Sequence, residues 1–319
     1  MLGRRAFLTG VGAGLAGCSR CGAPSATSSS SVEADPSATV LPPPPPIPEG
    51  GVGERGQVVT ETWRLGDDGR AVTIVPAWKK PDERLPVLLA FHGRGEAMKG
   101  PDLGVMGWPK DYKLLRAIER VSAPPLTAED FESFVEPARL EHHNEALAAR
   151  PFAGLVVVCP YSPDGDWRSP KAMSAYATYV VETVLPRVKK ELPVLGTPAS
   201  IGLDGVSLGG AQSLRIGFSR PELFGAIGTL QAALDEGQAG EMTELAKAAR
   251  AKNPKLALRL LTSKEDYFRR AIRATSQAWR AAGIEHDFEE VPGPHDYPFN
   301  RGPGAIEMLL WHDRTLARS

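Results

Sequence analysis

Five short, mainly apolar runs limit the folds open to this 319-residue chain. They are PVLLAF at 86–91, GLVVVCP at 154–160, SIGLDG at 200–205, AIGTLQ at 226–231 and LALRLLT at 256–262. A strand that lacks polar alternation is buried on both faces, and such strands are typical of parallel sheets. Stretches with helical periodicity lie between the runs. Strands that alternate with helices predict an α/β fold with a mostly parallel central sheet and helices on both faces.

Two features depart from simple alternation, the start of the folded part and a long insertion. Residues 58–65 and 71–76 read as two β segments joined across GDDG, which predicts an antiparallel hairpin and a mixed sheet. Residues 284–292 predict a last strand, and residues 305–317 a last helix. The segment 98–152, which follows the first buried strand, is a long helical insertion. It is either a functional lid or a helical layer that covers the sheet.

The first residues have the pattern of an export signal rather than of a folded element. The arginine pair Arg4 and Arg5 precedes a glycine-rich apolar stretch that is shorter than the roughly 20 residues of a membrane span. The stretch ends in LAGC, at Cys18. This pattern resembles a bacterial lipoprotein leader with a twin-arginine signal, which implies cleavage before Cys18 and lipidation of that cysteine. The alternative is an ordinary signal peptide followed by a chance cysteine.

This interpretation divides the chain into three parts. Residues 1–17 are the signal peptide, and residues 18–55 are a Ser- and Pro-rich tether that cannot bury apolar surface. Residues 56–319 are the folded domain. We expect an exported cell-envelope lipoprotein, in the periplasm or at the outer membrane or cell surface, held by its lipid anchor alone. The formal net charge of −1 creates no field that would attract nucleic acid.

The three cysteines do not form a disulfide framework. Cys18 is assigned to the lipid and Cys21 lies in the tether, whereas Cys159 ends an apolar run and is expected to be a buried thiol. A bridge between Cys21 and Cys159 has no positive support. Since no Cys/His cluster has metal-ligand spacing, we expect neither a metal nor an organic cofactor.

The motif G-x-S-x-G lies between a predicted strand and a predicted helix. Gly205, Ser207 and Gly209 are its fixed residues. This setting is typical of a nucleophile elbow, in which a tight turn exposes the serine at a helix N-terminus. The alternative is a serine that only caps the helix.

A serine nucleophile needs a base, and His295 is the best placed of the six histidines. It stands in VPGPHDYPF, directly after the last predicted strand, where ligand chemistry gathers in open α/β sheets. The acid is expected between serine and histidine in the chain. Asp266 is the first candidate, although it can equally cap the next helix, and Glu265 and Asp235 stay open as alternatives.

Backbone amides after the first buried strand complete the predicted site. HGRG at residues 92–95 occupies the position of an oxyanion loop. The donors would be the N–H groups of Leu208 and Arg94, with Gly93 as second choice. Trp108 and Tyr112 follow this loop and are expected to line the acyl pocket.

Taken together, these motifs resemble the α/β-hydrolase superfamily from about residue 85 to 318. The similar branch contains esterase D, feruloyl and acetylxylan esterases and lipoproteins like polyhydroxybutyrate depolymerase. The motifs that carry the resemblance are HGRG, VVVCPYSPDGDW, DGVSLGG, SKED and PGPHDY. The branch usually has Gly-Gly-His before its last helix, whereas Pro294 precedes His295 here.

The resemblance implies a serine hydrolase of the carboxylesterase type that acts on a small-molecule or polymer-linked ester. A peptidase or amidase, or an acyltransferase, would use the same catalytic residues. A non-catalytic envelope binding protein that kept the fold is the remaining alternative.

Overall fold

The computed structural model describes residues 53–167 and 169–318. The predicted signal peptide, Cys18 and nearly all of the predicted tether lie outside the described residues. None of the described helices has the length and apolarity that a bilayer span requires.

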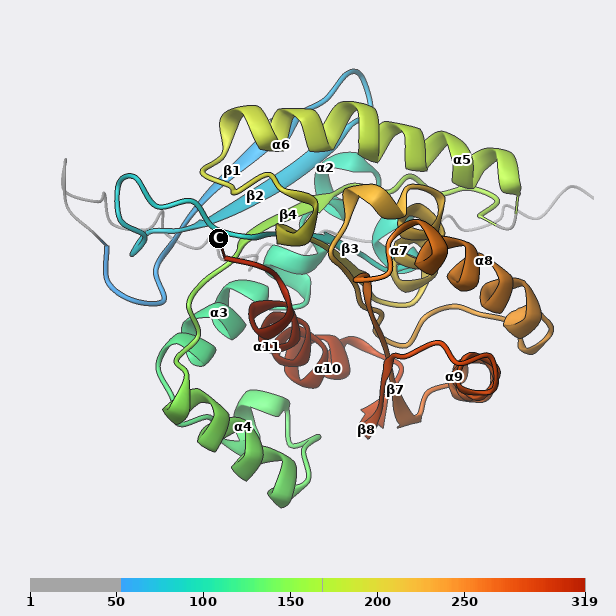
Figure 1. The fold of residues 1–319 in the computed structure, drawn as a ribbon. Coiled ribbons are helices and arrows are strands. Elements are labelled where there is room, and N and C mark those ends of the chain that lie inside the picture. Colours follow the sequence, from blue (N-terminus) through green and yellow to red (C-terminus); the bar gives the residue numbers. More distant parts are fainter. Residues whose placement is uncertain (1–52, 168, 319) are drawn as a thin grey trace, which may run out of the picture. The chain divides into compact units, whose positions relative to one another are not determined.

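The described residues form an eight-stranded sheet in the order β1-β2-β4-β3-β5-β6-β7-β8 (Figure 1). The first two strands are the predicted antiparallel hairpin, and β2 also runs antiparallel to β4. All the following neighbours are parallel, which confirms the predicted mixed, mostly parallel sheet. The strands are β1 Val58–Arg64, β2 Arg70–Pro76, β3 Val87–Phe91, β4 Val156–Pro160, β5 Ile201–Gly205, β6 Ala226–Ile227, β7 Ala257–Glu265 and β8 Asp287–Pro294.

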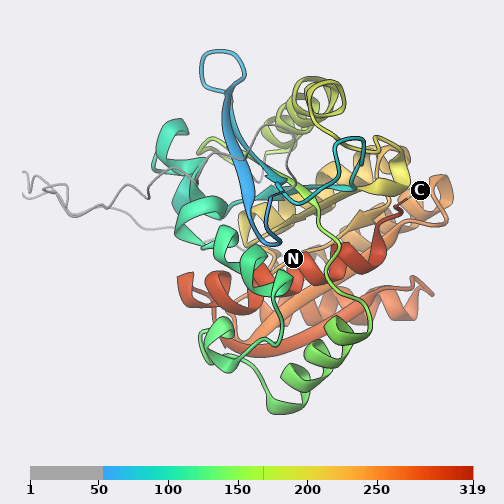
Figure 2. The same ribbon diagram turned by 90° about the vertical axis from the view of Figure 1, so that its left-hand side faces the viewer.

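Helices cover both faces of the sheet (Figures 1 and 2). They are α1 Arg94–Ala97, α2 Pro101–Gly104, α3 Leu114–Ser122, α4 Pro137–Ala149, α5 Pro170–Tyr179, α6 Leu185–Glu191, α7 Leu208–Ser219, α8 Ala239–Lys252, α9 Arg269–Ala281, α10 Tyr297–Phe299 and α11 Ala305–Thr315. The core on one face takes side chains from α5 to α9, and the core on the other takes them from α3, α4, α10 and α11.

The central strands explain why the apolar runs lack alternation. In β3, Val87 and Leu89 join the first core, whereas Leu88 and Ala90 join the second. Every residue of β3, β4 and β5 is buried. Cys159 of β4 is a buried free thiol, as predicted, and burial raises its pKa.

The insertion forms a side layer. Leu114, Ile118 and Val121 of α3, and Leu147 of α4, are buried in the second core beside α11. This packing favours the predicted helical layer over the lid, because the insertion supplies core residues rather than a detachable cover.

An ion-pair cluster also fastens the insertion to the last helix. Arg139 and His143 of α4 bond to Glu307 of α11, and Arg139 also reaches Glu289 of β8. Burial would raise the pKa of Glu307, but the hydrogen bonds from His143 and Arg139 outweigh it and lower that pKa to about 2. His143 itself is buried.

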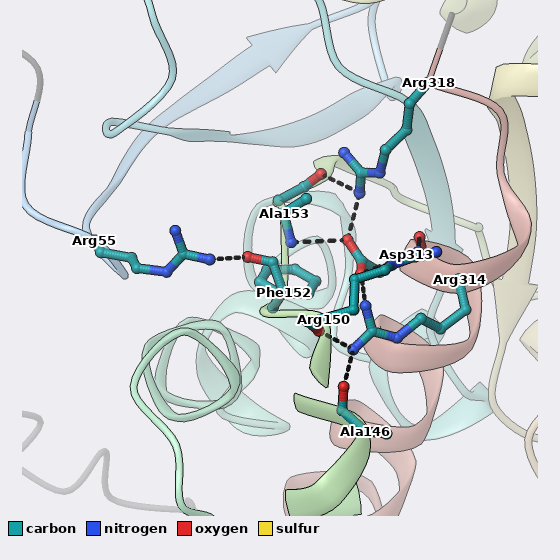
Figure 3. Close-up of polar contacts among 9 residues, drawn as sticks. Arg55, Ala146, Arg150, Phe152, Ala153, Asp313, Arg314 and Arg318 are labelled. Carbon is teal, nitrogen blue, oxygen red and sulfur yellow. Dashed lines mark hydrogen bonds and ion pairs between the residues drawn. The ribbon is translucent and has the colours of Figure 1, made fainter. Parts of the chain in front are cut away.

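A second cluster of this kind surrounds Asp313, which has no exposed surface (Figure 3). Its carboxylate accepts from the Ala153 N–H at 3.1 Å and from Arg314 and Arg318, and it pairs with Arg150 at 3.7 Å. The arginines also bond to main-chain carbonyls, among them those of Ala146 and Arg150 near the end of α4. The end of α11 is thereby tied to the connection that leads from the insertion into β4.

Candidate active site

Ser207 stands at a strained turn between β5 and α7, with φ 56° and ψ −114°. A non-glycine residue rarely adopts a positive φ unless its surroundings enforce it. Here the Val206 N–H donates to the Phe91 carbonyl at 3.2 Å, and the Ser207 N–H donates to the Leu230 carbonyl at 2.9 Å. These bonds fix the turn against the end of β3 and against Leu230, which forms a single bridge to β7. This is the geometry of a nucleophile elbow.

The two glycines of the motif are needed because backbones pass very close together. A Cβ at Gly205 would lie 2.6 Å from the carbonyl carbon of Gly209 and 2.8 Å from the Phe91 oxygen. A Cβ at Gly209 would lie 2.6 Å from the carbonyl carbon of Phe91 and 2.7 Å from the His92 oxygen. No side chain fits in either place, so the first turn of α7 can press against the end of β3.

The predicted base and acid lie in direct contact. His295 follows β8, Asp266 follows β7, and the Nδ1 atom of His295 is 2.7 Å from the Asp266 Oδ1 atom. The Asp266 carboxylate also accepts from the Phe268 N–H at 2.9 Å and from the Thr262 hydroxyl at 2.7 Å. The aspartate is therefore fixed by its own donors while it orients the imidazole.

The structure does not bring the alternative acids to His295. Glu265 is exposed at the end of β7, and Asp235 is exposed in a capping box with Gln238. The cap alternative for Asp266 holds in part, because the same oxygen that faces His295 accepts the Phe268 N–H just ahead of α9.

Two aromatic side chains next to Asp266 enclose the imidazole. The Tyr267 ring lies 4.2 Å from the His295 ring, and its hydroxyl donates to the His295 carbonyl at 3.0 Å. The Phe268 ring meets the imidazole edge-on at 5.3 Å. We did not predict these contacts from the sequence, although the aromatic pair Tyr267 and Phe268 directly after the acid was the available signal.

His92 has a structural position in the oxyanion loop. It is buried, its Nδ1 atom lies 2.9 Å from the Gly93 carbonyl, and its Nε2 atom accepts from the Ser162 N–H at 3.0 Å. Burial lowers the pKa of His92, which keeps the imidazole neutral as an acceptor.

The predicted oxyanion donors are the first amides of two helices. Leu208 begins α7 and Arg94 begins α1, so neither N–H has a partner within its own helix. The two loops are adjacent, since a Cβ at Gly93 would lie 3.8 Å from the Ser207 Cβ. The Gly93 N–H is instead directed to the Tyr112 hydroxyl, at 3.3 Å. Arg94 is therefore better placed than Gly93 to donate.

A cavity of about 400 Å³ opens beside Ser207. This volume lies within the usual range of small-molecule sites. Its lining is Arg94, Gly165, Asp166, Trp167, Met173, Ser207, Leu208, Ala211, Arg215, Ala233, Leu234, Asp235, Gln238 and Phe268. Phe268 connects the cavity to the base, because the same ring packs against His295.

The prediction that Trp108 and Tyr112 line the pocket is wrong. Both are buried behind the oxyanion loop and neither belongs to the lining of the cavity. The Trp108 indole donates to the Phe91 carbonyl at 2.9 Å, and the Tyr112 hydroxyl bonds to Glu96. Both side chains therefore bond to groups in the interior of the fold and do not line the cavity.

Within the described part of the chain, neither the Ser207 hydroxyl nor the Nε2 atom of His295 has a hydrogen-bond partner. Ser207 lines the cavity, whereas the His295–Asp266 pair adjoins it through Phe268, whose ring lines the cavity and packs against His295. Such bonds often tighten only when substrate is bound.

Comparison with known proteins identifies the fold. Residues 156–300 match a family model described as "Putative esterase". A solved ferulic acid esterase is similar at 16% identity with a TM-score of 0.62, over 82% of this chain and 98% of that one. The fold is that of an α/β-hydrolase. The S-formylglutathione hydrolase of Staphylococcus aureus is similar at 13% identity with a TM-score of 0.55, over 81% and 96% of the two chains.

A third similar solved structure is that of the fluorophosphonate-binding serine hydrolase F of Staphylococcus aureus. It is 13% identical, with a TM-score of 0.57, over 81% of this chain and 98% of that one. No curated protein matches the chain. The comparisons confirm the predicted resemblance to the esterase branch of the α/β-hydrolases and agree with a carboxylesterase-type enzyme.

Proposed function

We propose that this α/β-hydrolase cleaves carboxylic esters through an acyl-enzyme formed on Ser207. The observation that carries the proposal is the elbow itself: a strained serine at the start of α7, beside a cavity of about 400 Å³. The His295–Asp266 pair at 2.7 Å supplies the base. The esterase family match over 156–300 spans all three residues.

In the proposed mechanism, the Ser207 oxygen attacks the ester carbonyl while the Nε2 atom of His295 accepts the serine proton. Asp266 stabilises the imidazolium. The amides of Leu208 and Arg94 hold the oxyanion, and each such donor contributes roughly 3 kcal/mol to the transition state. The imidazolium then protonates the departing alcohol. Water, activated by His295, releases the acid and restores Ser207.

The lining of the cavity supports a substrate of small or medium size with an apolar part, beside polar groups that would face Arg94, Arg215 and Gln238. Trp167, Met173, Leu208, Leu234 and Phe268 offer apolar surface close to the nucleophile. Small-molecule esters and the exposed ends of ester-linked polymers both fit this description.

The test is hydrolysis of p-nitrophenyl esters of increasing acyl length, beside the matching anilides, by the wild type and Ser207→Ala. Ester turnover that the substitution lowers by several orders of magnitude supports the proposal. Turnover of anilides at a similar rate would favour an amidase or peptidase. Preferential transfer to an added alcohol would favour an acyltransferase. A folded wild type with no turnover would favour a binding protein.

We also propose that the protein is an exported cell-envelope lipoprotein, on the strength of the arginine pair and the LAGC sequence that ends at Cys18. Metabolic labelling with a fatty acid in a bacterial host tests this directly. Label in the wild type that is lost in Cys18→Ser is expected. Equal or absent label in both proteins would contradict the proposal.

A further inference from the structure

A buried carboxylate lies between the two catalytic loops. Glu96 belongs to α1, two residues beyond Arg94, and only 1% of it is exposed. The mechanism above does not use it. A buried carboxylate costs free energy unless hydrogen bonds compensate it, so its partners indicate why it is there.

The first partner of Glu96 connects it to the oxyanion loop. The Tyr112 hydroxyl donates to the Oε2 atom of Glu96 and accepts the Gly93 N–H at 3.3 Å. Burial, followed by the nearby Glu96 carboxylate, raises the pKa of Tyr112 well above its ordinary value. The phenol therefore stays protonated and remains a donor to Glu96.

The second partner comes from the loop of the base. Tyr297 stands two residues after His295, and its hydroxyl donates to the Oε1 atom of Glu96 at 2.6 Å. Lys99 in turn donates to the Tyr297 hydroxyl at 3.1 Å and to Asp111 at 2.8 Å. The rings of Tyr112 and Tyr297 also meet edge-on, with their centroids 5.6 Å apart.

We propose that Glu96 is a positioning residue that locks the Arg94 oxyanion amide and the His295 loop into one frame, through hydrogen bonds from Tyr112 and Tyr297. This inference rests on the proposed function. Each carboxylate oxygen takes one tyrosine, so a shift of either loop breaks a buried bond. Misplacement by about 1 Å can cost a hundredfold in rate, and this frame prevents such a shift.

The frame also selects the oxyanion donor. Because Tyr112 takes up the Gly93 N–H, this loop offers the Arg94 N–H to the substrate. The network therefore acts on the transition state, where the oxyanion forms, more than on binding of the ground-state ester.

The experiment compares four variants of the whole protein with p-nitrophenyl acetate: Tyr112→Phe, Tyr297→Phe, their double variant and Tyr179→Phe. Tyr179 is a matched control, because its buried hydroxyl has no hydrogen-bond partner among the described residues and lies outside the cavity lining. We expect each network variant to lower kcat about 10- to 100-fold, with KM within about threefold of wild type. The double variant should lose less than the product of the single losses, because both hydroxyls act through Glu96.

Thermal unfolding midpoints separate positioning from a general loss of stability. If Tyr112→Phe fails to fold, the test relies on Tyr297→Phe and on Glu96→Gln. Tyr297 lies nearer the surface than Tyr112, and glutamine keeps the shape of the glutamate side chain. Unchanged kcat in Tyr297→Phe, a loss that appears only in KM, or losses that multiply in the double variant would each overturn the inference. Wild-type turnover equal to that of Ser207→Ala in the same assay would instead overturn the proposed function.

Discussion

Asp266→Asn tests the acid at the level of a single atom. In the structure, the Oδ1 atom of Asp266 serves both His295 and the Phe268 N–H, whereas Oδ2 accepts from the Thr262 hydroxyl. A backbone N–H can only donate, so the asparagine oxygen must stay on that side. The new NH₂ group then faces the Thr262 hydroxyl, which can turn to accept. The amide therefore keeps an acceptor opposite His295 and preserves its tautomer.

The expected loss is the difference between a charged and a neutral hydrogen bond. A bond to a charged group contributes about 1.5–3 kcal/mol and a neutral one about 0.5–1.5 kcal/mol. The difference of about 1–2 kcal/mol predicts a loss in kcat of roughly 5- to 30-fold. Asp266→Ala removes the acceptor altogether and should lose about 10⁴-fold, as in triads that lose the correct tautomer.

The assay is kcat on p-nitrophenyl acetate, with Glu265→Gln as the matched control. Glu265 is the exposed neighbouring carboxylate and should change kcat less than twofold. If Asp266→Asn were as inactive as Asp266→Ala, the amide would have turned its nitrogen to His295 and the orientation argument would fail. If both variants kept wild-type activity, Asp266 would not be the acid.

Three further outcomes follow from the packing. Gly209→Ala places a methyl group 2.6 Å from the carbonyl carbon of Phe91 and should lower the free energy of unfolding by about 1–3 kcal/mol, measured in urea, whereas Gly240→Ala meets nothing within 4 Å and should not destabilise. Trp108→Ala should lower the free energy of unfolding by about 3–5 kcal/mol but leave the acyl-length preference unchanged. A changed preference would show that Trp108 does line the acyl pocket. The lowered pKa of Glu307 stabilises the fold fully above its ordinary value of 4.5, and this contribution is lost as the pH falls towards 2. The difference in the free energy of unfolding between wild type and Glu307→Gln should therefore decrease as the pH falls from 4.5 towards 2. A difference that does not change with pH would contradict this prediction.

The parts of the site that the sequence predicts are those that local chemistry determines. A fully apolar run identifies β3, and a glycine-flanked serine between strand and helix identifies the elbow. His295 and Asp266 could be named because each directly follows a strand that the pattern had placed. The carboxyl ends of parallel strands meet at one edge, so adjacency in space follows from the topology.

The residues that the sequence did not reveal depend on distant contacts. Tyr297 and Glu96 are 201 positions apart, and no periodicity relates them. Trp108 and Tyr112 were placed in the pocket because aromatics follow the oxyanion loop, but a side chain's direction is set by the partners it finds. Here those partners are the Phe91 carbonyl and the Glu96 carboxylate, on the side away from the cavity.

The boundaries of strands and helices also depend on contacts that the sequence pattern does not show. The run at 226–231 suggested a full strand, yet β6 is only Ala226–Ile227. It stops where Gly228 faces the buried Asp204 carboxyl, since a Cβ at Gly228 would lie 2.8 Å from the Asp204 Cγ. Leu230 then rejoins the sheet through single bridges. The helical stretch that begins at Pro170 continues to Glu191, and a π-helical turn at Val180–Val184 accommodates Pro186 within it.

The strand that precedes the base, β8, lies at the edge of the sheet. The strand pairs with β7 alone, and ion pairs such as Arg269–Glu290 and Arg139–Glu289 tie it to α9 and α4. Edge elements open locally at a lower free energy than the core, and added salt weakens partly exposed ion pairs. Activity should therefore fade at denaturant and salt concentrations that leave the circular dichroism of the helices intact. In this protein, loss of catalysis would be an early sign of opening, well ahead of global unfolding.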